Sequence, residues 1–369
     1  MAENLILDSM LGVLEDLVMT ETPSDDRALL DQGMRLTSAL VHRLLGEVPE
    51  TLESGGRPHL RLRGSAPRPV LLLCHLDTVW PAGTAARWPF AVTGERATGP
   101  GVFDMKAGLV QGLYALSSAA CQDDVTLLIT SDEEIGSPSS RSLIEAEARR
   151  SRAVLVLEPS ADGALKTARK GVSMYRLNVT GRAAHAGLEP ERGVNALLEL
   201  AHQVRSVAAL TTDGTSVTPT TATAGTTTNT VPAHAELAVD VRAWTVAEQD
   251  RVHRALTGLR PALAGAALRL DGGINRPPLE AVRSTVLAGV AEECAASLGL
   301  APPGRAAVGG ASDGNFTAAL GVPTLDGLGA VGGNAHAEGE WLDVTTITDR
   351  TALVRALLER LTGPEGEPA

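Results

Sequence analysis

Short apolar runs alternate with amphipathic stretches along the first 160 residues of the chain. Residues 70–74, 125–130 and 153–157 are almost entirely apolar, which is typical of strands buried on both faces of a largely parallel sheet. Apolar residues recur at helical spacing over residues 105–120 and 137–150. This order of strands and helices predicts an α/β domain whose central, mostly parallel sheet lies between helices.

Two further helices are expected before the first strand. Apolar residues from Leu7 to Val18 fall at helical spacing, and Pro23 ends this helix. Ser24 is expected to cap the second helix, because its hydroxyl can accept a hydrogen bond from the first turn. That helix should end near Gly46.

The pattern changes in the middle of the chain. Residues 172–180 and 235–241 alternate between apolar and polar, which indicates strands with one solvated face. Amphipathic helices are expected near 194–208 and 245–259, so this part predicts a smaller α+β domain. The Thr-rich residues 211–230 suit an edge strand, because Thr is β-branched.

Buried-strand character returns late in the chain. Residues 323–325 are expected to form a short buried strand, after a helix at 279–298. We therefore expect one larger domain of residues 1–172 and 278–369, interrupted by a smaller inserted domain of residues 173–277.

Composition limits the possible partners and location. The chain of 369 residues has a formal net charge of −12, which argues against nucleic-acid binding. The three cysteines provide neither a disulfide framework nor a zinc knuckle. No basic residue precedes Arg27 and no apolar run is long enough to cross a bilayer. We expect a cytoplasmic protein with no membrane partner.

Polar side chains follow all three predicted buried strands. His75 and Asp77 come after the first strand, Glu133 and Glu134 after the second, and Glu158 after the third. Ligands in open α/β sheets bind beyond the carboxyl ends of the strands, so these side chains should meet there. Adjacent carboxylates repel each other unless a cation or a proton relieves them.

Two further candidates lie outside the strands. Asp104 precedes a predicted helix, and His336 lies in a Gly-rich loop. Singly, each residue has an ordinary explanation: Asp104 can cap the helix, and His75 can simply pair with Asp77. Their repetition favours a metal site, because independent structural roles would scatter such residues over both ends of the sheet.

The set provides two imidazoles and three carboxylates: His75, Asp104, Glu134, Glu158 and His336. These suffice for two Zn²⁺ ions per subunit, each with one His, one terminal carboxylate and a shared bridging carboxylate. Oxygen and imidazole ligands also accept Co²⁺ or Mn²⁺. Glu133, beside a ligand, can act as a general base, and Asp77 can orient the imidazole of His75.

Five segments and one later residue occur in a recognisable order. They are HLDTV at 75–79, GVFDMKAG at 101–108, TSDEEIGS at 130–137, LEPS at 157–160, GRAAHAG at 181–187 and His336. Together they resemble the co-catalytic zinc exopeptidase and deacylase family of glutamate carboxypeptidase, acetylornithine deacetylase and succinyl-diaminopimelate desuccinylase. The resemblance covers nearly the whole chain and is nearest to bacterial glutamate carboxypeptidase.

The resemblance implies a zinc-exopeptidase-like catalytic domain whose insert serves as lid and dimer interface. His75 and Glu158 would complete one zinc site, Glu134 and His336 the other, and Asp104 would bridge them.

Within this family pattern, other residues match groups that handle protons and the substrate. Glu133 would take a proton from the attacking water and later give one to the leaving amine. His185 would reach the partner subunit's active site and polarise the scissile carbonyl, although a surface turn would also explain it. Asn229 would help bind the oxyanion, or is a turn residue.

Four more residues match groups that recognise a substrate carboxylate. Arg242 and Arg276 would bind it bidentately, unless they form solvated ion pairs. Gly310 and Ser312 would line its pocket. Residues 309–316 depart from the glutamate carboxypeptidase pattern, and this departure leaves the preferred amino acid open.

We therefore expect a homodimeric amidohydrolase or carboxypeptidase that acts on an N-acyl amino acid or short peptide. It would release a carboxylate-bearing amino acid, with glutamate favoured. One alternative is a small-molecule N-deacylase of the acetylornithine or succinyl-diaminopimelate type. The other is a non-catalytic binding protein on the same fold, which would leave Glu133 without a clear use.

Overall fold

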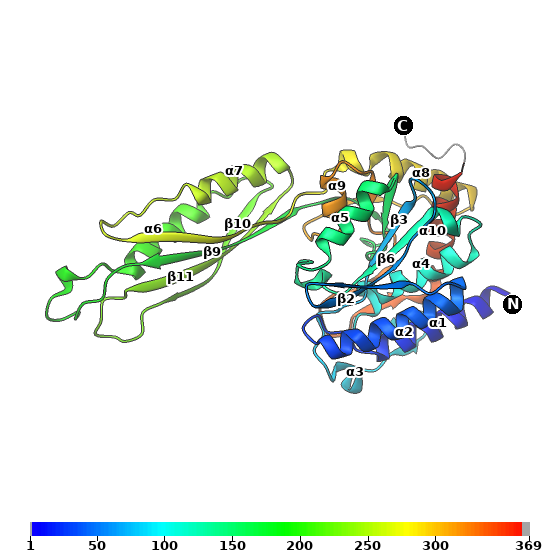
Figure 1. The fold of residues 1–369 in the computed structure, drawn as a ribbon, viewed down its shortest axis with the longest axis horizontal. Helices are drawn as coiled ribbons and strands as arrows, with labels where there is room; N and C mark the ends of the chain where they lie inside the picture. Colours follow the sequence, from blue (N-terminus) through cyan, green and yellow to red (C-terminus); the bar gives the residue numbers. More distant parts are fainter. Residues whose placement is uncertain (1, 364–369) are drawn as a thin grey trace. The chain divides into compact units, whose positions relative to one another are not determined.

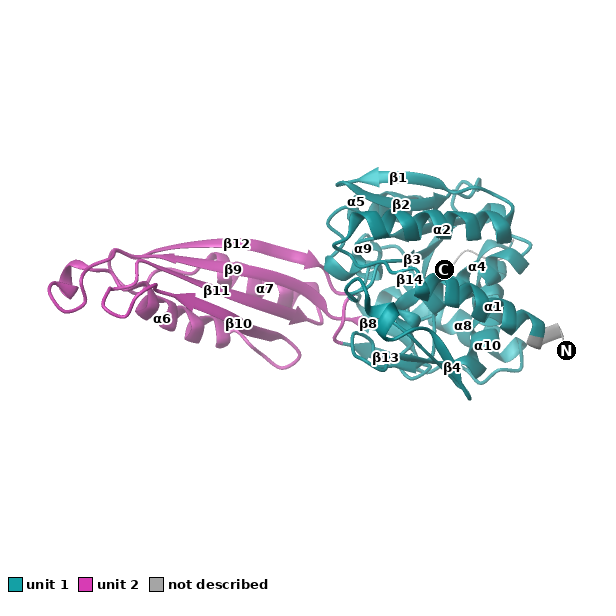
Figure 2. Ribbon diagram, turned by 90° about the horizontal axis from the view of Figure 1, so that it is seen from below, with its two compact units in different colours: residues 1–168, 279–308, 312–369 teal, residues 169–278, 309–311 magenta. Residues whose placement is uncertain are grey.

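A computed structural model describes residues 2–363, which form two compact units (Figures 1 and 2). Unit 1 comprises residues up to 168, residues 279–308 and those from 312 onward. Unit 2 comprises residues 169–278 and Gly309–Ala311. Unit 2 thus begins slightly before the insert expected at 173–277, and it takes in Gly310 from outside that range.

Unit 1 is built on a six-stranded sheet (Figure 1). The two strands at one edge of the sheet form an antiparallel hairpin, and the inner strand of that hairpin is also antiparallel to its other neighbour. All remaining pairs of neighbouring strands are parallel. The predicted α/β class is confirmed. In spatial order the strands are β1 (Glu50–Ser54), β2 (Arg57–Leu62), β6 (Val125–Thr130), β3 (Val70–His75), β7 (Ala153–Val156) and β14 (Thr324–Leu325).

Helices cover both faces of this sheet because its central strands are apolar on both sides. Leu72 and Cys74 of β3 belong to one buried cluster, whereas Leu71 and Leu73 belong to another that contains Phe316. The first cluster joins the sheet to α1 (Ala2–Met19), α2 (Arg27–Leu45), α4 (Ala107–Ser118), α8 (Thr285–Ser297) and α10 (Ile347–Thr362). The second joins it to α5 (Arg141–Arg150) and α9 (Gly314–Ala319).

Several short elements of unit 1 have no counterpart in the sequence prediction. A second sheet joins segments that are far apart in the chain, and a third pairs two strands. These elements are α3 (Thr84–Arg87), β4 (Ala91–Thr93), β5 (Arg96–Thr98), β15 (Gly332–Gly333) and β16 (Trp341–Asp343), together with the pair β8 (Leu165–Arg169) and β13 (Arg305–Val308).

Unit 2 is an antiparallel four-stranded sheet with two helices against one face (Figure 2). Inward-facing residues such as Leu177 and Leu237 pack against Leu200 and Val252 of the helices. The expected alternation and the Thr-rich edge strand are confirmed. The strand order is β10 (Ser216–Ala224), β11 (His234–Ala243), β9 (Gly171–Thr180) and β12 (Ala267–Arg276), and the helices are α6 (Ala196–Ala208) and α7 (Val246–Thr257).

The prediction that Ser24 caps α2 is wrong. Asp26 is the N-cap, and its carboxylate accepts hydrogen bonds from the N–H groups of Ala28 and Leu29. The buried Ser24 hydroxyl instead donates to Asp77 Oδ2 at 2.7 Å. A carboxylate is a better acceptor for helical N–H groups and lies closer to the first turn, so Asp26 takes this position.

No helix within residues 2–363 is both long and apolar enough to cross a membrane.

Helix α4 packs very closely against the residue that follows β7. A Cβ atom at Gly108 would lie 2.0 Å from the carbonyl oxygen of Leu157, far inside van der Waals contact. Gly289, in the middle of α8, would place a Cβ atom in open space.

The same substitution should therefore have opposite effects in these two helices. We expect Gly108→Ala to lower the free energy of unfolding by about 2–3 kcal/mol, because α4 must move away from Leu157. Gly289→Ala should raise it by about 0.5–1 kcal/mol, because Ala favours the helix. Urea unfolding followed by circular dichroism measures both, and equal effects of the two substitutions would contradict the packing argument.

Candidate metal centre

The parallel strands bring three acidic or imidazole side chains to one edge of the sheet. His75 is the last residue of β3, which lies between β6 and β7. Glu134 lies in the turn after β6, and Glu158 lies two residues after β7. Since parallel strands end at the same edge, these three residues converge there, as the sequence predicts.

Loops supply the remaining two candidates. Asp104 lies before α4, but it is not the N-cap of that helix, which begins at Ala107. Its backbone is non-helical, with φ −113° and ψ 98°. His336 lies in the loop between β15 and β16 and has a positive φ of 61°.

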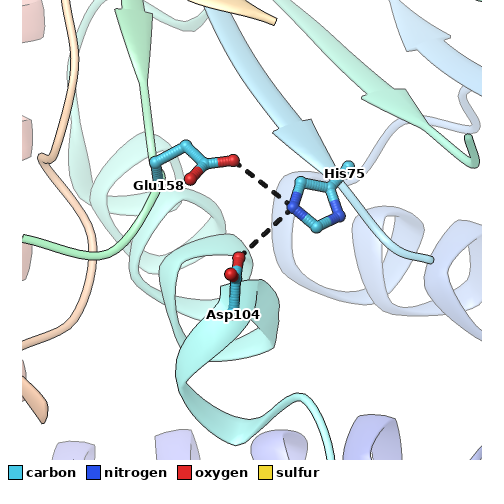
Figure 3. Close-up of side chains that lie close together, drawn as sticks. All are labelled: His75, Asp104 and Glu158. Atoms are coloured by element: carbon cyan, nitrogen blue, oxygen red, sulfur yellow. Dashed lines mark ion pairs between the residues drawn. The ribbon is translucent and has the colours of Figure 1, made fainter. Parts of the chain in front are cut away.

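Asp104 joins these residues into two groups. In the first group, His75 Nε2 lies 3.5 Å from Asp104 Oδ1 and 3.4 Å from Glu158 Oε1 (Figure 3). In the second, His336 Nε2 lies 3.3 Å from Asp104 Oδ2 and 3.1 Å from Glu134 Oε2. Asp104 thus turns one oxygen to each imidazole, as a bridging carboxylate would.

The donor atoms fit metal ions better than they fit each other. An N–H···O hydrogen bond is usually about 2.9–3.0 Å long, whereas two ligands of a tetrahedral Zn²⁺ lie about 3.3 Å apart. Three of the four separations, 3.3 to 3.5 Å, are close to the second value, whereas the 3.1 Å between His336 and Glu134 is near hydrogen-bond length. His75 Nε2, Asp104 Oδ1 and Glu134 Oε1 are also buried without a hydrogen-bond partner in the described part of the chain. Buried polar atoms are normally satisfied, so these three point to a cation as their partner.

The electrostatics of the protein chain alone show the same need for positive charge. Burial lowers the pKa of His75, but the facing carboxylates outweigh burial and raise it well above its usual value. Asp104 and Glu134 raise the pKa of His336 to about 11. Burial raises the pKa of Glu134 to about 7. The cluster therefore attracts protons, and bound cations would replace them.

Asp77 connects two of the segments that carry candidate ligands, and its side chain is fully buried. Its backbone carbonyl lies 3.0 Å from His75 Nδ1, and its Oδ1 lies 3.5 Å from the same nitrogen. The carbonyl accepts the Nδ1 proton, which leaves Nε2 free as a ligand. The Asp77 carboxylate also accepts hydrogen bonds from the N–H groups of Glu133 and Glu134, at 3.1 and 3.2 Å.

Glu133, the candidate base, lies next to the candidate ligand Glu134 in a short 3-10 turn after β6. Its side chain is largely buried, with 8% exposed. The hydrogen bond from its N–H to Asp77 ties this turn to the segment of His75.

Sequence reasoning missed two buried charged residues beside the cluster. The carboxylate of Glu340 is fully buried and accepts four hydrogen bonds, one of them from the N–H of Asp104. Lys106 donates from Nζ to the carbonyls of Leu17 and Thr20, at 2.9 and 3.0 Å. Burial lowers the pKa of Lys106 to about 7, and the charge of Glu340 opposes that shift. Lys106 lies within GVFDMKAG, whereas Glu340 carries no sequence signal.

Unit 2 holds five of the predicted substrate-binding residues, at two different places. His185 and Asn229 are exposed and close together, since the Asn229 carbonyl accepts the N–H of Ala186 at 2.9 Å. The N–H of Gly187 donates to His185 Nδ1 at 3.1 Å, so Nε2 remains available.

Arg242, Arg276 and Gly310 lie at the other end of the same sheet. Arg242 of β11 and Arg276 of β12 both pair with Val172, near the start of β9. Arg169 donates to the Gly310 carbonyl at 3.2 Å. The distance from Val172 to the far end of β9 is about 27 Å at 3.4 Å per residue, so these residues and His185 form separate groups.

Ser312 lies in unit 1 and is fully buried. Its hydroxyl donates to Asp326 Oδ2 at 2.5 Å and accepts the N–H of Gly314 at 3.1 Å. These contacts fix the loop before α9, whose helical residues begin after Asp313.

Comparisons with known proteins agree with this geometry. The model of peptidase family M20/M25/M40 matches residues 71–360. Carboxypeptidase G2 of Pseudomonas sp. (strain RS-16) is 31% identical, over 95% of this chain and 88% of its own length. Succinyl-diaminopimelate desuccinylase 2 of Shewanella loihica is 29% identical, over 80% of this chain and 85% of its own length. The chain therefore belongs to the peptidase family M20/M25/M40.

Solved structures show the same fold. An M20 family metallo-carboxypeptidase from Sulfolobus solfataricus has a TM-score of 0.74 at 16% identity, covering 95% of this chain and 98% of its own. Aminopeptidase PepT from Bacillus cereus has a TM-score of 0.72 at 19% identity, covering 96% and 98%. Family membership makes the protein a hydrolase of the metallopeptidase class, and the non-catalytic alternative falls away.

The two groups make distinct predictions for metal binding. Asp104→Ala should remove metal from both positions, because both groups share Asp104. Glu158→Ala should remove metal from one position only, because Glu158 belongs to the first group alone. Inductively coupled plasma mass spectrometry after dialysis gives the metal content per chain. Unchanged content in Asp104→Ala, or identical losses in both variants, would contradict the bridging arrangement.

Proposed function

We propose that this protein is a two-metal amidohydrolase that releases a carboxylate-bearing amino acid, glutamate in the favoured case, from an N-acyl or peptide substrate. The observation that carries the proposal is the pair of ligand groups that share Asp104. The 31% identity to carboxypeptidase G2 supports the carboxypeptidase direction of cleavage.

His75, Asp104 and Glu158 would hold one divalent cation, and Asp104, Glu134 and His336 the other. When bound, such a pair polarises the scissile carbonyl and lowers the pKa of a water molecule at neutral pH. The donor set of two imidazoles and three carboxylates suits Zn²⁺, and it also accepts Co²⁺ or Mn²⁺.

Glu133 would move the protons of the reaction. It would accept a proton from the attacking water and deliver it to the nitrogen of the leaving amine, so the same carboxylate serves as base and then as acid. The hydrogen bond of its N–H to Asp77 holds its backbone, and Asp77 also holds Glu134 and His75. The base would therefore keep a fixed relation to the ligands on either side.

Arg242 and Arg276 would bind the carboxylate of the amino acid that is released. Both residues pair with Val172, one from each of the two strands that flank β9, so they lie at the same level of the sheet. Arg242 already forms an ion pair with Asp240 at 2.9 Å, and a substrate carboxylate would compete with Asp240 for its planar fork. Gly310 would border this carboxylate, and Ser312 would act by fixing the loop before α9 through its bond to Asp326.

His185 and Asn229 would stabilise the oxyanion from the partner subunit of a homodimer. Arg242 and Arg276 lie level with Val172, about 27 Å along β9 from its far end, beyond which His185 follows in the chain. One small substrate spans far less than this. If all four act on one molecule, His185 and Asn229 must come from the other copy. Unit 2 would then serve as the dimer interface, and a two-fold dimer would contain two such sites.

The relationship to succinyl-diaminopimelate desuccinylases favours a second candidate, a small-molecule N-deacylase. This enzyme would use the same metal ligands and the same Glu133. The two functions differ in the acyl group and in the amine that is released, so product identification separates them.

The zinc-loaded protein should release glutamate from N-acyl and dipeptide derivatives, and a chelator should stop the release. Mass spectrometry of a panel based on Glu, Asp, Gly, Ala, ornithine and diaminopimelate identifies the product. Release of diaminopimelate or ornithine instead would replace the first function with the second.

Glu133→Gln should lower turnover by at least about 10²-fold while metal content stays unchanged. Near-normal turnover in this variant would remove Glu133 from the proposal.

Mixed dimers test whether His185 acts on the partner subunit. His185→Ala and Glu133→Gln homodimers should both be nearly inactive. A heterodimer of the two, purified by different tags after co-expression, has one site with both Glu133 and His185 intact if His185 acts in trans. It should recover about half of the wild-type activity, because one of two sites is complete. A heterodimer without activity would show that His185 serves its own chain.

A further inference from the structure

Glu340 is a buried carboxylate with an unusually complete set of donors. It lies four residues after His336, directly before β16, and none of its surface is exposed. Oε1 accepts the N–H groups of Phe103 and Asp104, at 2.8 and 2.9 Å. Oε2 accepts the N–H of Gly101 at 2.9 Å and Trp80 Nε1 at 2.8 Å. A carboxylate has about four acceptor positions, so its whole capacity is used.

These bonds act where the backbone has little other support. Asp104 is in neither a regular helix nor a strand, and Gly101 has a positive φ of 72°. Regular hydrogen-bond ladders therefore do not fix the segment that carries the bridging ligand. Charge-assisted bonds from three backbone N–H groups to one anion are stronger than neutral bonds, and they hold this segment as a unit.

The donors of Glu340 connect it to three ligand-bearing segments. Trp80 lies five residues after His75, Asp104 donates its own N–H, and His336 precedes Glu340 in the same loop. Any displacement of this carboxylate therefore shifts the segments of three ligands together. Both ligand groups include Asp104, so both would change.

We propose that Glu340 is a positioning residue that holds the segments of His75, Asp104 and His336 in register, so that both metal positions form together. The inference rests on the proposed two-metal function. Trp80 would share this positioning role, because its indole N–H links Glu340 to the loop that follows His75.

Glu340→Gln separates positioning from simple space filling. Gln has the same shape, but only one of its terminal atoms is an acceptor. Its NH₂ group must face two N–H donors, either those of Phe103 and Asp104 or those of Gly101 and Trp80. The substitution thus keeps the packing and breaks half of the hydrogen bonds. Glu338→Gln is the matched control, because Glu338 is exposed in the same loop.

The test titrates the metal-free full-length proteins with Co²⁺ and records the visible spectrum and the binding stoichiometry. We expect Glu340→Gln to fold normally by circular dichroism, to bind Co²⁺ about 10–100-fold more weakly at both positions, and to shift the Co²⁺ absorption bands. Glu338→Gln should match the wild type. A folded Glu340→Gln protein with wild-type affinity and spectrum would overturn the inference, and so would weakening at one position only.

Trp80→Phe keeps the inference testable if Glu340→Gln does not fold. This substitution removes the indole N–H that donates to Glu340 Oε2 and keeps an aromatic ring at the position. The ring of Trp80 packs edge-on against that of Trp88, with the two ring centroids 5.2 Å apart. We expect a few-fold loss of Co²⁺ affinity with a spectral shift, whereas Trp88→Phe should leave both unchanged. A wild-type spectrum in Trp80→Phe would count against the inference. If the wild-type protein itself bound fewer than two Co²⁺ ions, the two-metal function would fail, and Glu340 would lose its role with it.

Discussion

The concentration of negative charge at one edge of the sheet of unit 1 is the constraint on which its structure depends. Asp104 faces two imidazoles, and Glu134 and Glu158 complete the two groups. Such a cluster is unfavourable unless cations, protons or hydrogen-bond donors compensate it. The parallel strands concentrate these groups where their ends meet, and the loops must then supply the compensation. The apolar strands behind them provide a rigid support that keeps these side chains in place.

Two other buried carboxylates, Asp77 and Glu340, order the loops that carry these groups. Asp77 accepts N–H groups from the turn of Glu134, and Glu340 accepts that of Asp104. Each anion orders a loop by binding backbone donors, which is an efficient use of a buried charge because irregular loops otherwise leave N–H groups unsatisfied. Ser24 belongs to the same system, and its bond to Asp77 explains why Asp26 caps α2 instead.

Local patterns predicted the parts of this protein that depend on local chemistry. The strand at residues 125–130 agrees with the structure because six consecutive buried positions need apolar residues. The hairpin β1–β2 was not predicted, since its exposed positions carry charged residues and long-range pairing stabilises it. Glu340 shows the same limit for the site. Glu338 and Glu340 lie in one Gly-containing loop, and only tertiary burial distinguishes the exposed residue from the fully buried one.

The ten-residue length of β9 has a consequence for how such a protein can change during evolution. Loss of one residue would turn the following side chains to the opposite face of the sheet, and loss of two would restore the faces but shorten the strand by about 7 Å. In the proposed dimer, either change would move His185 away from the oxyanion while every functional side chain stayed present. Selection would therefore act on the spacing between positions in unit 2 as strongly as on their chemistry, and substitutions would be tolerated where insertions and deletions are not.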